Sequence, residues 1–274
     1  MADNSQIGVF DSGVGGLSVL REIRKRLPSL AIHYFADQGH APYGQRPLGQ
    51  VRHFAVGITR FLRNIGCEII VVACNTASAA ALHHLRRKFE DIHFVGMEPA
   101  IKPAAEITRT GFVGVLATTA TFQGQLYASV VERFANDVQL LQSTCPGLVA
   151  QIEKGEMDTK KTHEILEAAI TPMLQKGIDT IVLGCTHYPL VIPLIQKIAG
   201  PEVRVIDPAP AVARQVERVL LSNETRIASG GPGSLVFYTS GDRIVFCNGL
   251  HVLLGETGPV RQARWKGNKI IIEA

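Results

Sequence analysis

The stretch EIIVVACNTAS at residues 68–78 decides the fold, because a second stretch, DTIVLGCTH at residues 179–187, repeats its pattern. Each is preceded by a glycine eight residues before its cysteine. Each then runs from a polar residue through apolar residues to the cysteine and two further polar residues. This pattern is typical of a buried parallel strand that carries a thiol at its carboxyl end. We therefore expect two strands that present Cys74 and Cys185 in equivalent places.

Other landmarks around these stretches match in the same order. The apolar run at residues 112–116 restates the run at residues 7–10, and Asp-Pro-Ala at residues 207–209 echoes Glu-Pro-Ala at residues 98–100. Three matched landmarks in one order indicate an internal duplication of an α/β unit of about 100 residues.

The composition is that of an ordinary globular protein. Of the 274 residues, 46% are apolar and 19% are charged, so the chain can bury a large core in one large or two modest domains. No apolar run approaches the roughly 20 residues that span a bilayer. The five cysteines are widely spaced and form no C-x-x-C pair, which disfavours a disulfide framework or a zinc site. We expect a cytoplasmic protein that neither spans a membrane nor binds a metal.

The charge pattern does not favour nucleic acid as a partner. The net charge is only +4, and the basic residues are not interleaved with aromatic residues. One minor alternative remains, namely weak polyanion binding by residues 257–272, which carry basic residues and no acid. These basic residues are Arg261, Arg264, Lys266 and Lys269.

A glycine-rich turn, DSGVGG at residues 11–16, follows the first apolar run and precedes apolar residues at helical spacing. A dinucleotide fingerprint would need a glycine where this chain has Ser18, so that interpretation is weak. Two interpretations remain open. The turn and the helix amino terminus could approach an anionic ligand closely, or the turn could simply be tight, with Ser12 capping the helix.

The rest of the pattern alternates strands and helices. We predict strands at residues 31–36, 93–96, 138–141 and 203–206, and helices at residues 48–64, 77–89, 148–155, 162–176 and 211–221. The loop at residues 229–234 lacks the lysine of a phosphate-binding loop, and its proline removes a donor, so we interpret it as a linker. Short strands are expected from residue 235 onward, and the last 25 residues carry no functional signal.

Ligands of open parallel sheets bind outside the carboxyl ends of the strands. If the two halves face each other, the polar residues at these strand ends converge: Asp11, Ser12, Cys74, Asn75, Thr76, Thr118, Cys185, Thr186 and His187. A single cysteine there would more simply be a small buried hydrophobe. Two matched thiols, however, can supply a base on one face of a carbon and an acid on the other, which inversion of a stereocentre requires. His187 could tune the Cys185 thiol or shuttle its proton.

The remaining cysteines lack this repeated context. Cys67 and Cys247 are not followed by the same polar residues, and Cys145 precedes a proline in a loop. We expect all three to be structural.

Together these motifs resemble glutamate racemase, the cofactor-independent racemase family of bacterial cell-wall synthesis. The resemblance extends to about residue 242 and is carried by residues 7–17, 42–44, 72–78, 148–149, 152–153 and 183–190. It implies an α/β fold of two similar parallel-sheet domains with the active site in the cleft between them. The first domain would comprise residues 1–100 plus 208–274, and the second residues 101–207.

The resemblance also implies roles for individual residues. Cys74 would take the α-proton of D-glutamate and Cys185 that of L-glutamate, with Asp11 and His187 assisting the thiols and Asp37 and Glu153 as supporting acids. The substrate-binding residues would be Asp11, Ser12, Pro42, Tyr43, Gly44, Asn75, Thr76, Thr118, Thr121, Thr186 and His187. No cofactor or metal is expected, and the protein would be a homodimer that supplies D-glutamate for peptidoglycan and hence for cell shape.

Two alternatives stay open at this point. Aspartate racemase, or another member of the two-cysteine superfamily, would share the chemistry and differ in the length of its pocket. A non-catalytic module of two α/β lobes that binds a small ligand would use the cysteines only for packing.

Overall fold

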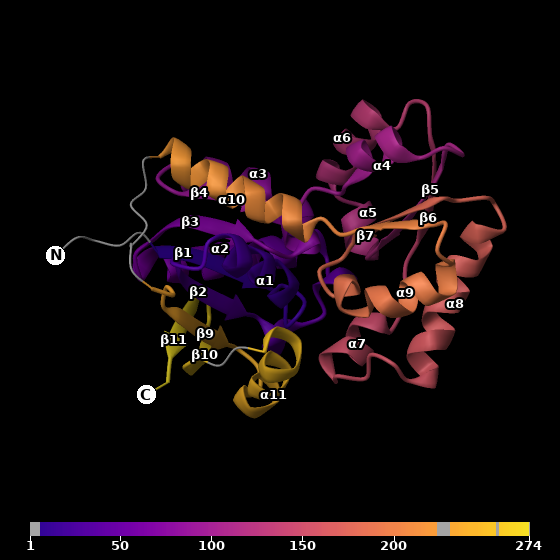
Figure 1. Ribbon diagram of the computed structural model, residues 1–274. Helices are drawn as coiled ribbons and strands as arrows, with labels where there is room; N and C mark the ends of the chain where they lie inside the picture. The colour runs from indigo at the N-terminus through magenta and orange to yellow at the C-terminus, as the bar shows by residue number, and fades with distance from the viewer. Residues whose placement is uncertain (1–5, 224–230, 256–257, 274) are drawn as a thin grey trace.

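The strands of the protein form two separate sheets in the computed structural model, which describes residues 6–223, 231–255 and 258–273 (Figure 1). The larger sheet contains β1 (Gln6–Asp11), β2 (Ala31–Ala36), β3 (Cys67–Val72), β4 (His93–Gly96), β9 (Leu235–Thr239), β10 (Val260–Lys266) and β11 (Lys269–Ile272). The smaller sheet contains β5 (Phe112–Ala117), β6 (Gln139–Ser143), β7 (Thr180–Gly184) and β8 (Arg204–Ile206). Neighbouring strands are parallel, except for the antiparallel pair β10 and β11 at one edge.

The internal duplication is visible in the strand order. The larger sheet contains the sequence of neighbours β2-β1-β3-β4, and the smaller sheet is β6-β5-β7-β8, so the two cysteine strands, β3 and β7, occupy the same position. Each follows a glycine in the left-handed region, Gly66 with φ of 96° and Gly177 with φ of 85°, where a side chain would be strained. The predicted α/β fold class is confirmed, and the antiparallel edge pair is an addition to it.

Helices cover both faces of each sheet (Figure 1). On the larger sheet, α1 (Leu17–Arg26), α10 (Ala209–Ser222) and α11 (Arg243–Leu254) pack on one face, and α2 (Leu48–Asn64) and α3 (Asn75–Lys88) on the other. On the smaller sheet, α7 (Leu148–Glu153), α8 (Lys160–Leu174) and α9 (Ile192–Ala199) cover one face, and α4 (Ile101–Ile107) and α6 (Gln125–Phe134) the other. We call the larger sheet with its helices the first half, and the smaller sheet with its helices the second half.

The carboxyl-terminal part of the chain returns to the first half. Helix α10 packs against α1, and β9 then pairs with β2 in parallel register. The short strands expected from residue 235 onward are present as β9, β10 and β11, but helix α11, between β9 and β10, was not predicted. The N-cap residue of α11 is Asp242, whose carboxylate accepts the backbone N–H groups of Ile244 and Val245. Aspartate is a preferred N-cap residue.

The loop expected to be a linker lies only partly within the described residues. Residues 229 and 230 fall outside them, whereas Gly233 donates its N–H to the Pro28 carbonyl and lies so close to Leu30 that a Cβ would clash. None of the helices in the described part of the chain combines the length and the apolar character needed to cross a membrane.

Candidate active site

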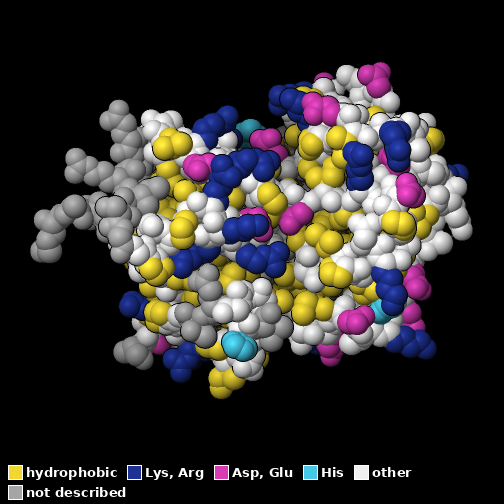
Figure 2. Space-filling view, in the orientation of Figure 1, with side chains coloured by type: hydrophobic (Ala, Val, Ile, Leu, Met, Phe, Trp, Pro, Cys, Tyr) yellow, Lys and Arg dark blue, Asp and Glu magenta, His cyan; other side chains and the backbone are white. Residues whose placement is uncertain are grey.

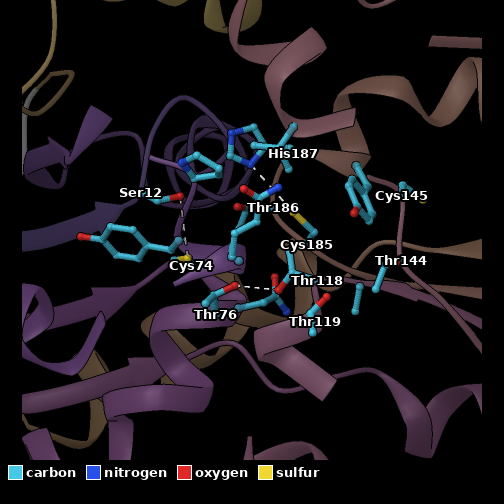
Figure 3. Close-up of a pocket in the computed structure, with 18 of the residues that line it drawn as sticks. Ser12, Cys74, Thr76, Thr118, Thr119, Thr144, Cys145, Cys185, Thr186 and His187 are labelled. Carbon is cyan, nitrogen blue, oxygen red and sulfur yellow. Dashed lines mark hydrogen bonds between the residues drawn. The ribbon is translucent and has the colours of Figure 1, made fainter. Parts of the chain in front are cut away.

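A cavity of about 130 Å³ lies where the two halves meet (Figure 3). Both predicted cysteines line it, each at the carboxyl end of its strand. The other predicted residues that line it are Ser12, Pro42, Tyr43, Gly44, Asn75, Thr76, Thr118, Thr186 and His187. Four predicted residues do not line the cavity but hydrogen-bond to residues that do: Asp11, Asp37, Thr121 and Glu153. The structure therefore brings the predicted set together from both halves.

Cys74 occupies the amino terminus of α3. It is the N-cap residue of the helix, and its Sγ atom accepts the backbone N–H of Ala77 at 3.4 Å. On the other side, Sγ lies 4.0 Å from the Ser12 hydroxyl (Figure 3). Burial raises the pKa of the Cys74 thiol well above its usual value, and the nearby Asp11 carboxylate raises it further. Cys74 is therefore a neutral thiol in this structure.

Cys185 has a different neighbour. Its Sγ lies 3.8 Å from Nδ1 of His187, and Nε2 of the same ring lies 2.6 Å from Oε1 of Glu153. Burial on its own would lower the pKa of His187, but hydrogen bonds with Cys185 and Glu153 raise it well above the usual value. The raised pKa keeps the His187 ring protonated at its place beside the Cys185 sulfur.

Asp11 connects the two halves next to the cavity, without lining it. Its carboxylate accepts the backbone N–H groups of Gly13 and Gly16 and the Thr186 hydroxyl, at 3.2, 3.0 and 3.2 Å. Burial raises its pKa, although His187 and the two N–H groups oppose the shift. The glycine-rich turn therefore closes around the side chain of Asp11, whose Oδ2 accepts two of its N–H groups. The interpretation of Ser12 as a helix cap is wrong, since the N-cap residue of α1 is Gly16 and no side chain caps the helix.

Asn75 is the clearest unfilled group in the site. It is 3% exposed, and neither its side-chain oxygen nor its nitrogen has a hydrogen-bond partner among the described residues. A buried amide without partners is costly, and either a bound ligand or an ordered water would satisfy this one. Nearby, the hydroxyls of Thr76, Thr118 and Thr121 form a triangle across the two halves, with contacts of 2.9 to 3.4 Å.

Asp37 lies behind the cavity wall. It is fully buried, and its carboxylate accepts hydrogen bonds from Tyr43, Ser240, Trp265 and His40. Burial alone would raise the pKa of Asp37, but the hydrogen bonds from His40, Ser240 and Tyr43 outweigh it and lower the pKa below the usual value. Asp37 is therefore ionised and supports Tyr43 without itself facing the cavity.

Some lining residues were not predicted. They come mainly from the loop after β6 and from the neighbours of predicted residues: Gln45, Ala117, Thr119, Thr144, Cys145, Pro146, Gly147, Val149, Ala150 and Tyr188. Cys145 was expected to be only structural, yet its buried side chain lines the cavity; burial raises its pKa to about 12. The loop could have been found by the same rule, because it follows the carboxyl end of β6.

The fold and the site define a two-lobed α/β protein with paired thiols facing one cavity. Residues 7–216 match the family model described as Asp/Glu/Hydantoin racemase, and the chain belongs to this family. Glutamate racemase of Roseiflexus sp. is 48% identical over 260 residues, covering 92% of this chain and 94% of the relative. That of Pseudomonas aeruginosa (strain UCBPP-PA14) is 49% identical over 238 residues, covering 87% and 89%.

Solved structures agree with the sequence relatives. Glutamate racemase isoform RacE1 of Bacillus anthracis matches with a TM-score of 0.84 and 33% identity, covering 93% of this chain and 96% of that one. The Escherichia coli glutamate racemase in complex with L-glutamate and the activator UDP-MurNAc-ala matches with a TM-score of 0.83 and 32% identity, covering 96% and 100%. The resemblance to glutamate racemase that the motifs indicated is confirmed.

Proposed function

We propose that this protein is a glutamate racemase that interconverts L- and D-glutamate with Cys74 and Cys185 as its two acid/base residues. The observation that carries the proposal is the pairing of these thiols. They end matched strands of a duplicated fold, and they line one cavity from opposite halves. The glutamate racemases among the relatives support the choice of substrate.

In the direction from L-glutamate, Cys185 acts first. Its sulfur, which lies beside the His187 ring, takes the α-proton as a thiolate, and the electron pair of the broken C–H bond moves into the α-carboxylate. Cys74, which is a neutral thiol, then gives its proton to the opposite face of the carbon. The product is D-glutamate, with Cys185 protonated and Cys74 anionic. The reverse reaction starts from that state, so Cys74 takes the α-proton of D-glutamate.

Proton transfer alone does not supply the rate. A positioned acid/base pair contributes only ~10²–10⁴-fold. Donors aimed at the carboxylate as it gains enolate character would supply much of the rest. The unpartnered amide of Asn75 and the hydroxyls of Thr76 and Thr186 are the candidates in this cavity.

Solvent exchange tests the proposal directly. L-glutamate incubated with the protein in D₂O, without added cofactor, is expected to become racemic and to carry deuterium at the α-carbon, because the donated proton comes from a thiol that equilibrates with solvent. Exchange of aspartate without exchange of glutamate would identify an aspartate racemase instead. Exchange of neither amino acid would favour a non-catalytic binding module.

The wider role follows from the product. We propose that the protein supplies D-glutamate for peptidoglycan in the cytoplasm, as a homodimer whose subunits divide into residues 1–100 plus 208–274 and residues 101–207. Growth of a D-glutamate auxotroph on expression of this protein tests the first part. Sedimentation of the purified protein tests the second.

A further inference from the structure

The carboxyl-terminal hairpin of β10 and β11 reaches the site through one side chain. Trp265 lies on β10, and its indole Nε1 donates a hydrogen bond of 2.8 Å to Oδ1 of Asp37. Trp265 is also the sole tryptophan of the sequence. A residue far along the chain from the predicted motifs thus contacts the carboxylate directly behind the cavity wall.

The indole is firmly seated. Its ring lies 5.4 Å from that of His40 and 5.7 Å from that of Phe54, which itself stacks on His40 at 4.0 Å. Gly57 of α2 makes room for it, because a Cβ at this position would lie 2.4 Å from the indole. A built pocket of this kind fixes the direction of the N–H group.

Tyr43 links Asp37 to the cavity wall. The Tyr43 hydroxyl donates to Oδ2 of Asp37, and the ring of Tyr43 with Pro42 and Gly44 forms part of the cavity wall. This wall also touches the second half, since a Cβ on Gly44 would lie 2.6 Å from Cβ of Thr118. A shift of Asp37 would therefore move this part of the wall, whose Tyr43 belongs to the same buried cluster as Cys74.

We propose that Trp265 is a positioning residue for the active site: its N–H group and the Ser240 hydroxyl together fix Oδ1 of Asp37, and Asp37 in turn fixes Tyr43 and the wall formed by residues 42–44. The inference rests on the proposed racemase function. A wall that holds substrate equally in the ground state and the transition state affects KM more than kcat. A hydrogen bond to a charged group is strong enough for its loss to raise KM roughly 10-fold or more.

The single tryptophan allows a sharp test. Biosynthetic replacement of tryptophan by β-(3-benzothienyl)alanine, which keeps the shape of the indole but has sulfur in place of N–H, changes residue 265 alone. KM for both enantiomers is expected to rise roughly 10-fold while kcat stays within about threefold. Trp265→Phe is expected to act in the same direction. An unchanged KM in the benzothienyl protein would overturn the inference.

A second readout does not depend on activity. Alkylation of Cys74 by iodoacetamide, followed by mass spectrometry of its peptide, is expected to be faster in the benzothienyl protein, because the loosened wall exposes a thiol that is 4% exposed in this structure. An unchanged rate counts against the inference. If the unmodified protein does not racemise glutamate, the proposed function fails, and the alkylation rates still decide the role of Trp265.

Ile270→Val is the matched control. Ile270 pairs with Trp265 across the hairpin and packs against the same core. Its side chain has no polar atom and so cannot hydrogen-bond to Asp37. This variant is expected to keep the KM and the alkylation rate of the unmodified protein. A rise equal to that of the benzothienyl protein would show that any disturbance of the hairpin suffices, and would overturn the specific role of the N–H group.

Discussion

Glu153 and His187 form an ion pair in which His187 is buried and Glu153 partly buried, with Oε1 and Nε2 2.6 Å apart. The same carboxylate also accepts the backbone N–H of Val14 and the side-chain amide of Gln38, both from the first half. Glu153 therefore has two tasks that the sequence could not separate. It holds the ring beside Cys185 in its charged form, and it ties the second half to the first.

Glu153→Gln is expected to lower the free energy of unfolding by about 2–3 kcal/mol, because the variant leaves a buried imidazolium without its counter-charge. The effect depends on pH in a defined way. The pKa of Glu153 is lowered from 4.5, although burial opposes this, so its contribution is complete above pH 4.5 and is lost on acidification. The pKa of His187 is raised from 6.5, so its contribution is complete below pH 6.5 and is lost on alkalinisation. Urea unfolding of both proteins from pH 4 to 9 should show the largest difference between pH 4.5 and 6.5. A difference independent of pH would contradict the ion pair.

Cys74→Ser and Cys185→Ser are each expected to reduce racemisation by at least ~10²-fold in both directions, since a serine hydroxyl is a far weaker acid than a thiol. Circular dichroism should show an unchanged fold. Cys247→Ser is the control, because Cys247 is exposed and lies outside the cavity. Wild-type turnover in either active-site variant would rule out the two-base mechanism.

Asn75→Ala is expected to separate stability from activity. Its buried amide has no partner among the described residues, so removing it relieves a desolvation cost of about 1–3 kcal/mol, which offsets the packing that is lost. We expect an unchanged or higher midpoint of thermal unfolding together with a 10-fold to 100-fold lower kcat/KM, at roughly 1.4 kcal/mol per tenfold. Parallel loss of stability and activity would instead indicate a structural role.

Gly44→Ala is expected to lower kcat/KM roughly 10-fold, because the new methyl group would press on Thr118 and push the two halves apart at the cavity. Gly49→Ala is the matched control, since a Cβ at Gly49 meets nothing within 4 Å. Steady-state kinetics of the two variants provide the comparison. Equal kinetics in both would show that the contact between Gly44 and Thr118 does not matter for turnover.

The helices and strands that the sequence predicted best are those with a clear pattern of apolar residues. The helix at residues 48–64 and the strands at residues 31–36 and 93–96 match the structure to the residue, because one amphipathic face or one buried run decides each of them. Helix α11 was missed because its apolar residues lie on several sides, with Ile244 and Val245 exposed. Only its cap at Asp242 marks it locally.

Site residues were predictable where they directly follow a strand, and less so where they lie behind the cavity wall and contact other site residues. Cys74 and Cys185 are found by the rule that ligands bind at strand ends. Trp265 could not be found in this way, because its role depends on β10 joining the sheet beside β9, a pairing between distant parts of the chain. The loop containing Cys145 follows the rule, but its residues have no counterpart in the matched stretches.

The unequal surroundings of the two thiols have a limit set by thermodynamics. One sulfur lies beside an imidazolium and the other near a carboxylate, so the two half-reactions begin from differently poised groups. Enantiomers nevertheless have identical free energies, and for a racemase the Haldane relation then requires the same kcat/KM in both directions. The asymmetry can alter kcat and KM separately for each enantiomer, trading one against the other. It cannot move the end point away from an equal mixture, so any lasting excess of one form in the cell must come from the reactions that consume it.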